Sequence, residues 1–147
     1  MMRKAIPFII LIVMCLLAGC GEGPEKLCRI VIQSADGKGH VTLERQTQED
    51  VARLLDEENW VECAAVAESL SPKYILYLYQ EKTHTLLGAK DTYEKTMEYT
   101  VYEGSDIVKA AVCGDIMKGG FIAEEDLTVY YRGTEAFFSS VNRAVEP

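Results

Sequence analysis

The stretch PKYILYLYQ, residues 72–80, decides the fold of this chain. After its proline the side chains alternate with a period of two, which is typical of a half-buried β-strand. Leu76 and Leu78 fall on one side of that strand, and Tyr77 and Tyr79 fall on the other. A slip of one residue would bring the leucines out of the core, so burial fixes the register. The pattern predicts a sheet with a leucine side facing the core and a tyrosine side facing away from it.

Further strands are expected before and after this stretch. Residues 27–33 alternate in the same way, and Val41 and Leu43 resume the alternation after an Asp36-Gly37 turn, which predicts a hairpin. Later segments that also read as strands are residues 85–89, 96–103, 107–113 and 127–131. A loop is expected at Gly119-Gly120.

Helix signals lie between and after these strands. Thr47, with Asp50 three residues on, predicts a helix start, and Val51, Leu54 and Leu55 form its apolar stripe. A second, short helix is expected through the alanine-rich residues 63–67, capped by Asn59 and Glu62 and ended by Pro72. Thr134 predicts the start of a terminal helix whose inward side carries Phe137, Phe138, Val141 and Ala144.

Strands joined by turns, rather than alternating with long helices, favour an antiparallel sheet with the helices on one face. The expected fold class is α+β, in the order β-β-α-β-β-β-β-α, with two or three helices. Residues 27–147 are enough for one small domain and too few for two.

The N-terminal segment carries a different signal. Arg3 and Lys4 precede an apolar run over residues 5–19, and Leu17-Ala18-Gly19-Cys20 resembles the lipobox of bacterial lipoproteins. The run is shorter than the roughly 20 apolar residues that span a bilayer, which favours a signal peptide over a membrane helix. The resemblance implies a signal peptide at residues 1–19, removed during maturation, and lipid attachment at Cys20.

The lipobox resemblance implies a location in the bacterial cell envelope, outside the cytoplasm. The two or three acyl chains of such a protein make membrane attachment stable. Residues 20–26 then form a polar tether that reaches roughly 20 Å when extended, which keeps the domain near the lipid surface. The domain itself resembles those of small uncharacterised envelope lipoproteins with one α+β domain, and this resemblance implies no active site.

The net charge of the mature chain limits the classes of partner that it is expected to bind. Without residues 1–19 it has 13 Lys and Arg against 23 Asp and Glu, a net charge of −10. This balance argues against nucleic acid and against a second, electrostatic membrane contact. It favours cationic partners or serves solubility alone.

Beyond Cys20 the mature chain has the cysteines Cys28, Cys63 and Cys113. Their spacings match no zinc pattern, and no metal site or cofactor is expected. Buried thiols, one disulfide with a thiol left over, and a metal or catalytic role remain open alternatives. Cys28 shares the apolar side of its strand with Ile30 and Ile32, so we expect it to be buried and to react slowly.

Residue types that carry out catalysis are sparse. The histidines are His40 in the first turn and His84 in a polar segment, and no nucleophile elbow, zincin helix or phosphate loop accompanies them. The acidic runs at residues 56–58 and 124–126 are typical of solvated faces. We therefore expect no catalytic residues and no enzymatic activity.

The tyrosines indicate a binding function more strongly than the histidines or the acidic runs indicate catalysis. Tyr77, Tyr79 and Tyr102 fall on the side of their strands away from the expected core, where they would form a patch if those strands are neighbours. Such a patch can stack on sugars of the cell wall or hold a protein partner. The alternative is that cross-strand tyrosine pairs only stabilise the sheet.

These observations favour a lipid-anchored, non-enzymatic binding protein of the envelope. An acidic inhibitor or immunity-type protein against a cationic wall-acting enzyme is the alternative, for which the net charge is the only positive sign. A hydrolase is a further alternative that would need a concave site with convergent titratable groups.

Overall fold

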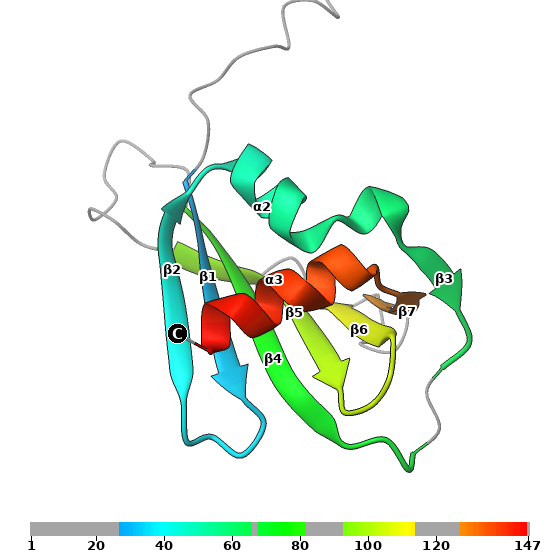
Figure 1. Cartoon of the computed structure of the whole chain (residues 1–147). Coiled ribbons are helices and arrows are strands. Elements are labelled where there is room, and N and C mark those ends of the chain that lie inside the picture. The colour runs from blue at the N-terminus through cyan, green and yellow to red at the C-terminus, as the bar shows by residue number, and fades with distance from the viewer. Residues whose placement is uncertain (1–26, 66–67, 82–92, 114–126, 147) are drawn as a thin grey trace, which may run out of the picture.

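The computed structural model describes residues 27–65, 68–81, 93–113 and 127–146, and the fold is given for these residues. They form a seven-stranded sheet and two α-helices (Figure 1). The strands are β1 Cys28–Ser34, β2 His40–Gln46, β3 Val61–Cys63, β4 Pro72–Glu81, β5 Tyr93–Tyr102, β6 Ile107–Val112 and β7 Thr128–Arg132. The helices are α2 Gln48–Leu55 and α3 Glu135–Val145, and a 3-10 turn, η2, spans Glu57–Asn59.

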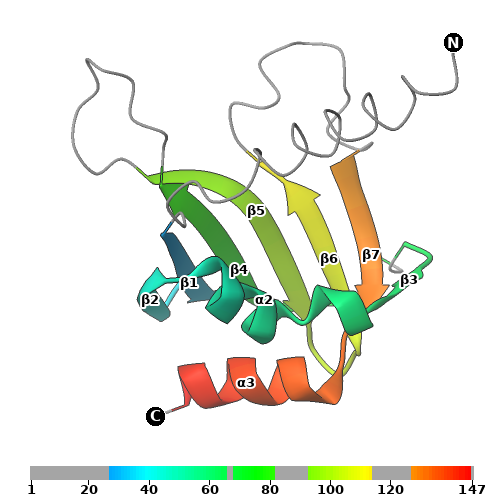
Figure 2. The same cartoon turned by 90° about the horizontal axis from the view of Figure 1, so that it is seen from above.

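The sheet has the strand order β2-β1-β4-β5-β6-β7-β3, and its neighbouring strands all pair antiparallel. Figure 2 shows α2 and α3 on the same side of it. The opposite side carries no helix among the described residues, and we call it the helix-free face. The expected α+β class with a mainly antiparallel sheet and its helices on one face is confirmed.

The core lies between the two helices and the sheet. Leu76 of β4 is completely buried and pairs with Ile32 of β1 and Tyr99 of β5. Trp60 packs into an aromatic cluster, with its ring centroid 4.9 Å from that of Phe137 and 6.0 Å from that of Tyr99. The expected inward side of β4 is therefore confirmed, and an aromatic cluster around Trp60 joins α3 to the sheet.

The helix starts follow the sequence signals. Thr47 and Asp50 form a reciprocal capping box at the start of α2, as expected. Thr134 caps α3 by accepting a hydrogen bond from the backbone N–H of Phe137. The Thr134 hydroxyl also donates to Asp56 Oδ2 at 2.9 Å, so one side chain joins the end of α2 to the start of α3.

The short helix expected over residues 63–67 is not formed at residues 63–65, and residues 66–67 lie outside the described ranges. The chain instead makes the turn η2 and the edge strand β3, which pairs with β7 through Glu62 and Tyr131. Burial of Trp60 in the aromatic cluster holds the following residues extended beside β7, and this outweighs the helical preference of alanine. The strand β3, at one edge of the sheet, was therefore not predicted.

Several expectations fall on residues outside the described ranges. These are the signal peptide at 1–19, the tether at 20–26, the strand at 85–89 and the loop at Gly119-Gly120. The strand expected at 96–103 begins earlier, at Tyr93, and those at 107–113 and 127–131 are confirmed to within a residue at each end. In the described part of the chain, neither helix has the length and apolarity needed to cross a bilayer.

Candidate functional site

The helix-free face carries Tyr77 and Tyr79, as the alternation of β4 predicts. Both side chains are half-buried, whereas Leu76 and Leu78 lie in the core. Val31 of β1 lies opposite Tyr77, and Arg29 lies opposite Tyr79. The two tyrosines are two residues apart on one strand, roughly 7 Å, so they form a single pair of neighbours.

Tyr102 does not join this pair. Glu98 is the β5 partner of Tyr77, and Tyr102 lies four residues further along, opposite Pro72, which is roughly 14 Å along the strand. Thr100, only 8 % exposed, lies between them on the same side. The structure thus brings Tyr77 and Tyr79 together and places Tyr102 at the other end of the face. Because Tyr102 is the last residue of β5, it also borders a hollow on the covered side of the sheet, beside α3, that Asn142 lines.

Tyr93 and Tyr130 are further tyrosines of this face that sequence reasoning missed. The Arg29 guanidinium carbon lies 4.4 Å from the ring centroid of Tyr93. Tyr130 of β7 pairs with Lys109 of β6. It lies near enough to Tyr102 to help raise the pKa of that phenol, after the larger effect of burial. The face therefore has two tyrosine groups, one around Tyr77 and one around Tyr102.

Charged side chains accompany the first group. Lys95 Nζ lies 4.8 Å from the ring centroid of Tyr77 and 3.6 Å from Glu98 Oε2. Burial raises the pKa of the Tyr77 phenol; the Glu98 carboxylate raises it further, and Lys95 opposes that effect. We call Tyr77, Tyr79, Tyr93, Arg29, Lys95 and Glu98 the tyrosine-cation cluster.

The other polar residues considered from sequence do not gather around this cluster. His40 is exposed at the start of the edge strand β2. His84 and the acidic run 124–126 lie outside the described ranges. In the run 56–58, Glu57 and Glu58 are exposed, as expected, although Glu57 also accepts a hydrogen bond from the Tyr99 hydroxyl. No group of three or more metal-ligating side chains occurs in the part of the chain that the structure describes.

The three cysteines are dispersed over the sheet. Cys28 is 1 % exposed in the core, which confirms the expected burial, and Cys63 and Cys113 are half-buried. Cys28 lies in β1 and Cys113 directly follows β6, three strand positions away or roughly 14 Å, and β7 separates Cys63 from β6. A disulfide needs Cα atoms within about 7 Å, so the spacing of these strands allows no disulfide between any two of the three.

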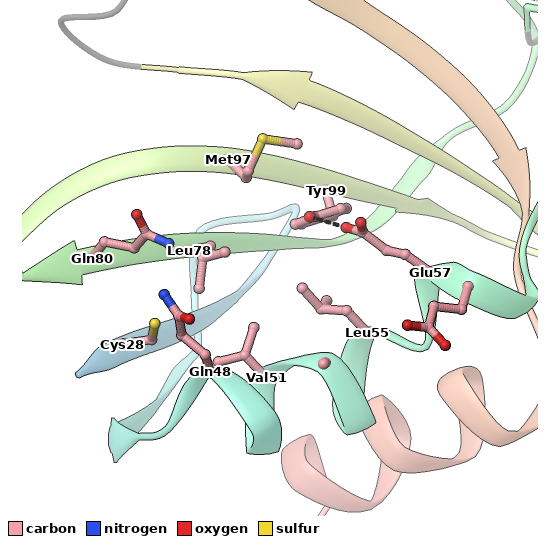
Figure 3. Close-up of a pocket in the computed structure, with 11 residues that line it drawn as sticks. Cys28, Gln48, Val51, Leu55, Glu57, Leu78, Gln80, Met97 and Tyr99 are labelled. Carbon is pink, nitrogen blue, oxygen red and sulfur yellow. Dashed lines mark hydrogen bonds between the residues drawn. The ribbon is translucent and has the colours of Figure 1, made fainter. Parts of the chain in front are cut away.

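The covered side of the sheet contains a cavity of about 420 Å³ between α2 and strands β1, β4 and β5 (Figure 3). Its apolar lining includes Val51 and Leu55 of α2, Leu78 of β4 and Met97 of β5. Polar groups of Gln48, Gln80, Glu57, Glu58 and Tyr99 also line it. Sequence reasoning missed this cavity, because its two walls come from segments distant in the chain.

Comparison with protein-family models, with curated proteins and with solved structures finds no match for this chain. The tyrosine-cation cluster and the cavity are therefore interpreted from their own chemistry.

Proposed function

We propose that this chain is a lipid-anchored protein of the bacterial cell envelope whose domain binds a partner protein through its helix-free face, without catalysing a reaction. The observation that carries the proposal is the tyrosine-cation cluster. Tyr77 and Tyr79 stand side by side and half-buried on the side of the sheet opposite both helices. Tyrosine and arginine are enriched in protein interfaces, where they combine large apolar area with hydrogen-bonding tips.

A protein partner fits this cluster better than a wall glycan does. Sugars stack on an open aromatic ring face, but Lys95 lies over the ring of Tyr77 and Arg29 over the ring of Tyr93. These cation contacts fix the rings and leave phenol hydroxyls and charges to meet a partner. Glu98, paired with Lys95, adds a carboxylate to the same surface. A partner with its own charged and hydrogen-bonding groups complements this mixture.

The non-enzymatic reading is supported by the placement of the candidate catalytic groups. His40 is exposed on the edge strand β2. Asp56 holds the start of α3 through Thr134, which is a structural role. General acid-base catalysis needs such groups within hydrogen-bond reach of one another and of a substrate.

The inhibitor alternative is favoured by one observation, the net charge of −10 for residues 20–147. An acidic inhibitor would meet a cationic enzyme through long-range attraction, which salt screens. Partner binding that falls steeply between low and high ionic strength would support that alternative. Binding through the tyrosine-cation cluster should depend less on salt, since its aromatic contacts are apolar.

The anchor is proposed from Leu17-Ala18-Gly19-Cys20 alone. In cells fed a labelled fatty acid, the native chain should incorporate label and a Cys20→Ala variant should not, leaving an uncleaved precursor. Normal incorporation in the variant would reject the lipobox assignment.

Site-specific photocrosslinking tests the binding face. A photoreactive phenylalanine analogue at position 79 in the full chain, in native membranes, should crosslink a discrete protein. The same analogue at Arg53, exposed on α2, is the matched control and should not crosslink that protein. Equal crosslinking from both positions, or none from position 79, would reject the helix-free face as the partner surface.

A further inference from the structure

The cavity under α2 is a second feature with the properties of a binding site, and it lies on the opposite side of the sheet from the tyrosine-cation cluster. Its volume of about 420 Å³ falls within the range of small-molecule sites in proteins. Residues of β1, β4 and β5 form one wall, and α2 with the following turn η2 forms the other (Figure 3).

The middle of the cavity is lined by apolar side chains that are mostly buried. Val51, Leu55 and Leu78 line it, and each is less than a tenth exposed. Met97 adds a thioether, a group that adapts to the shape of whatever packs against it. This part of the cavity can receive an aliphatic or aromatic group.

The polar groups of the cavity are separated into two ends. Figure 3 shows the amides of Gln48 and Gln80 directed toward each other at one end, and Glu57 beside Tyr99 at the other. Glu57 and Glu58 are exposed, so the carboxylate end opens to solvent.

The charged side chains among the described residues that line the cavity are all acidic. Among the described residues that line the cavity, Glu57 and Glu58 carry the only carboxyl groups, and none is a Lys, Arg or His. Arg53, the basic residue of α2, pairs with Glu49 on the exposed surface instead. The hydroxyl of Tyr99 donates to Glu57, which fixes one carboxylate oxygen at the cavity wall.

We propose that this cavity binds a small amphipathic amine, with its apolar group against Val51, Leu55 and Leu78 and its ammonium against Glu57 and Glu58. A carboxylate accepts a charge-assisted hydrogen bond from an ammonium, and two carboxylates at one end attract a cation. An amphiphile with an anionic head would bring like charge to the same end and lose binding. The net acidity of the chain raises the local concentration of cations and acts in the same direction.

A matched probe series tests the ligand class on the native protein. Phenethylamine, 2-phenylethanol and 3-phenylpropionate share an apolar group and differ in the head. They are titrated into full-length chain, labelled at its methionine methyl groups, in nanodiscs of neutral lipid, with the Met97 signal assigned from a Met97→Leu variant. The amine should shift that signal saturably, the alcohol should bind at least tenfold more weakly, and the carboxylate should not bind.

Variants then locate the charge recognition. Glu57→Gln with Glu58→Gln keeps an acceptor for Tyr99 and should weaken amine binding about tenfold, which corresponds to roughly 1.4 kcal/mol. Glu44→Gln on the exposed strand β2 is the control and should bind as the native chain does. Equal binding of amine and alcohol, binding of the carboxylate, no saturable shift of Met97, or unchanged binding in the double variant would each overturn the proposal.

Discussion

The two sides of strand β4 differ in what they contribute to the molecule. On the covered side Leu76 and Leu78 contact the core beneath the helices. On the helix-free side Tyr77 and Tyr79 stay half-buried beside Arg29 and Lys95. The difference indicates that the covered side supplies most of the folding free energy, because hydrophobic stabilisation follows buried apolar area. Tyr77 and Tyr79 lie outside that core, so substitutions on the two sides of β4 test folding and partner binding separately.

The largest loss of stability is expected when a large side chain is removed from the core on the covered side. Phe137 is 1 % exposed and packs on Trp60, so Phe137→Ala should lower the free energy of unfolding by about 3–5 kcal/mol. Urea denaturation followed by tryptophan fluorescence measures it, since Trp60 is the only tryptophan. Tyr79→Ser, which empties no core volume, is the comparison. Equal losses in the two variants would break the distinction between the two sides.

A smaller effect is expected at the joint between the helices. Asp56 has a left-handed backbone, with φ of 49°, and accepts the hydrogen bond from Thr134. Asp56→Ala should cost about 2 kcal/mol, because alanine strains that conformation and leaves the hydroxyl without its acceptor.

Asp56→Gly separates the two causes, since glycine tolerates the left-handed backbone and removes only the side-chain hydrogen bonds from Thr134 and Asn59. If urea denaturation shows that the glycine variant is as unstable as the alanine variant, backbone strain has no part in the loss.

Alkaline pH should lower the free energy of unfolding through Tyr99, which is buried on the covered side. Burial, then the hydrogen bond and charge of Glu57, raise the pKa of this phenol far above its usual value of 10. The folded chain therefore keeps a proton that the unfolded chain loses above pH 10. The stabilisation is complete below that pH and declines as the pH rises, by roughly 1.4 kcal/mol per pH unit at most.

Urea denaturation at pH 8 and pH 11 measures this decline, and Tyr99→Phe should lose less stability over the interval than the native chain. Identical losses in the two proteins would contradict the assigned role of Tyr99.

The alkylation rates of the cysteine thiols test how well the covered side is buried, and they require no substitution. Cys28 is buried on the covered side, and Cys63 is half-buried on the edge strand β3. Under native conditions an alkylating reagent should modify Cys63 well before Cys28, as followed by peptide mass spectrometry. Denaturant should equalise the two rates. Rapid native modification of Cys28 would mean that β1 opens far more readily than its packing implies.

The alternation of residues 72–80 was enough to predict which side of β4 is buried, because a period of two leaves only one way to bury both leucines. The position of Tyr93 could not be predicted in the same way. A bulge at Thr96, whose hydroxyl donates to the carbonyl of Leu78, interrupts the alternation of β5. Bulges depend on the pairing of two strands, which one strand's pattern does not contain.

Tertiary packing explains the remaining differences. Alanines after Cys63 predict a helix locally, but Trp60 fills the space between Phe137 and Tyr99, and the chain continues as β3. The separation of Tyr102 from Tyr77 follows from the register of β4 with β5, which is set by the whole hairpin. The cavity needs α2 to lie over β4 and β5, and no local pattern encodes that placement.

The most direct test of a binding role for the helix-free side combines partner capture with urea denaturation for a Tyr77→Ser, Tyr79→Ser double variant. Tyr102→Ser is the matched control, because it makes the same change at the far end of the same face. The double variant should keep a cooperative unfolding transition, since its cross-strand contacts contribute only about 0.2–1 kcal/mol each. It should lose capture by more than about 1–2 kcal/mol, and the control should not. If the double variant loses its cooperative transition while its folded fraction captures the partner as well as the native chain does, the tyrosines are structural and the helix-free face is not the binding surface.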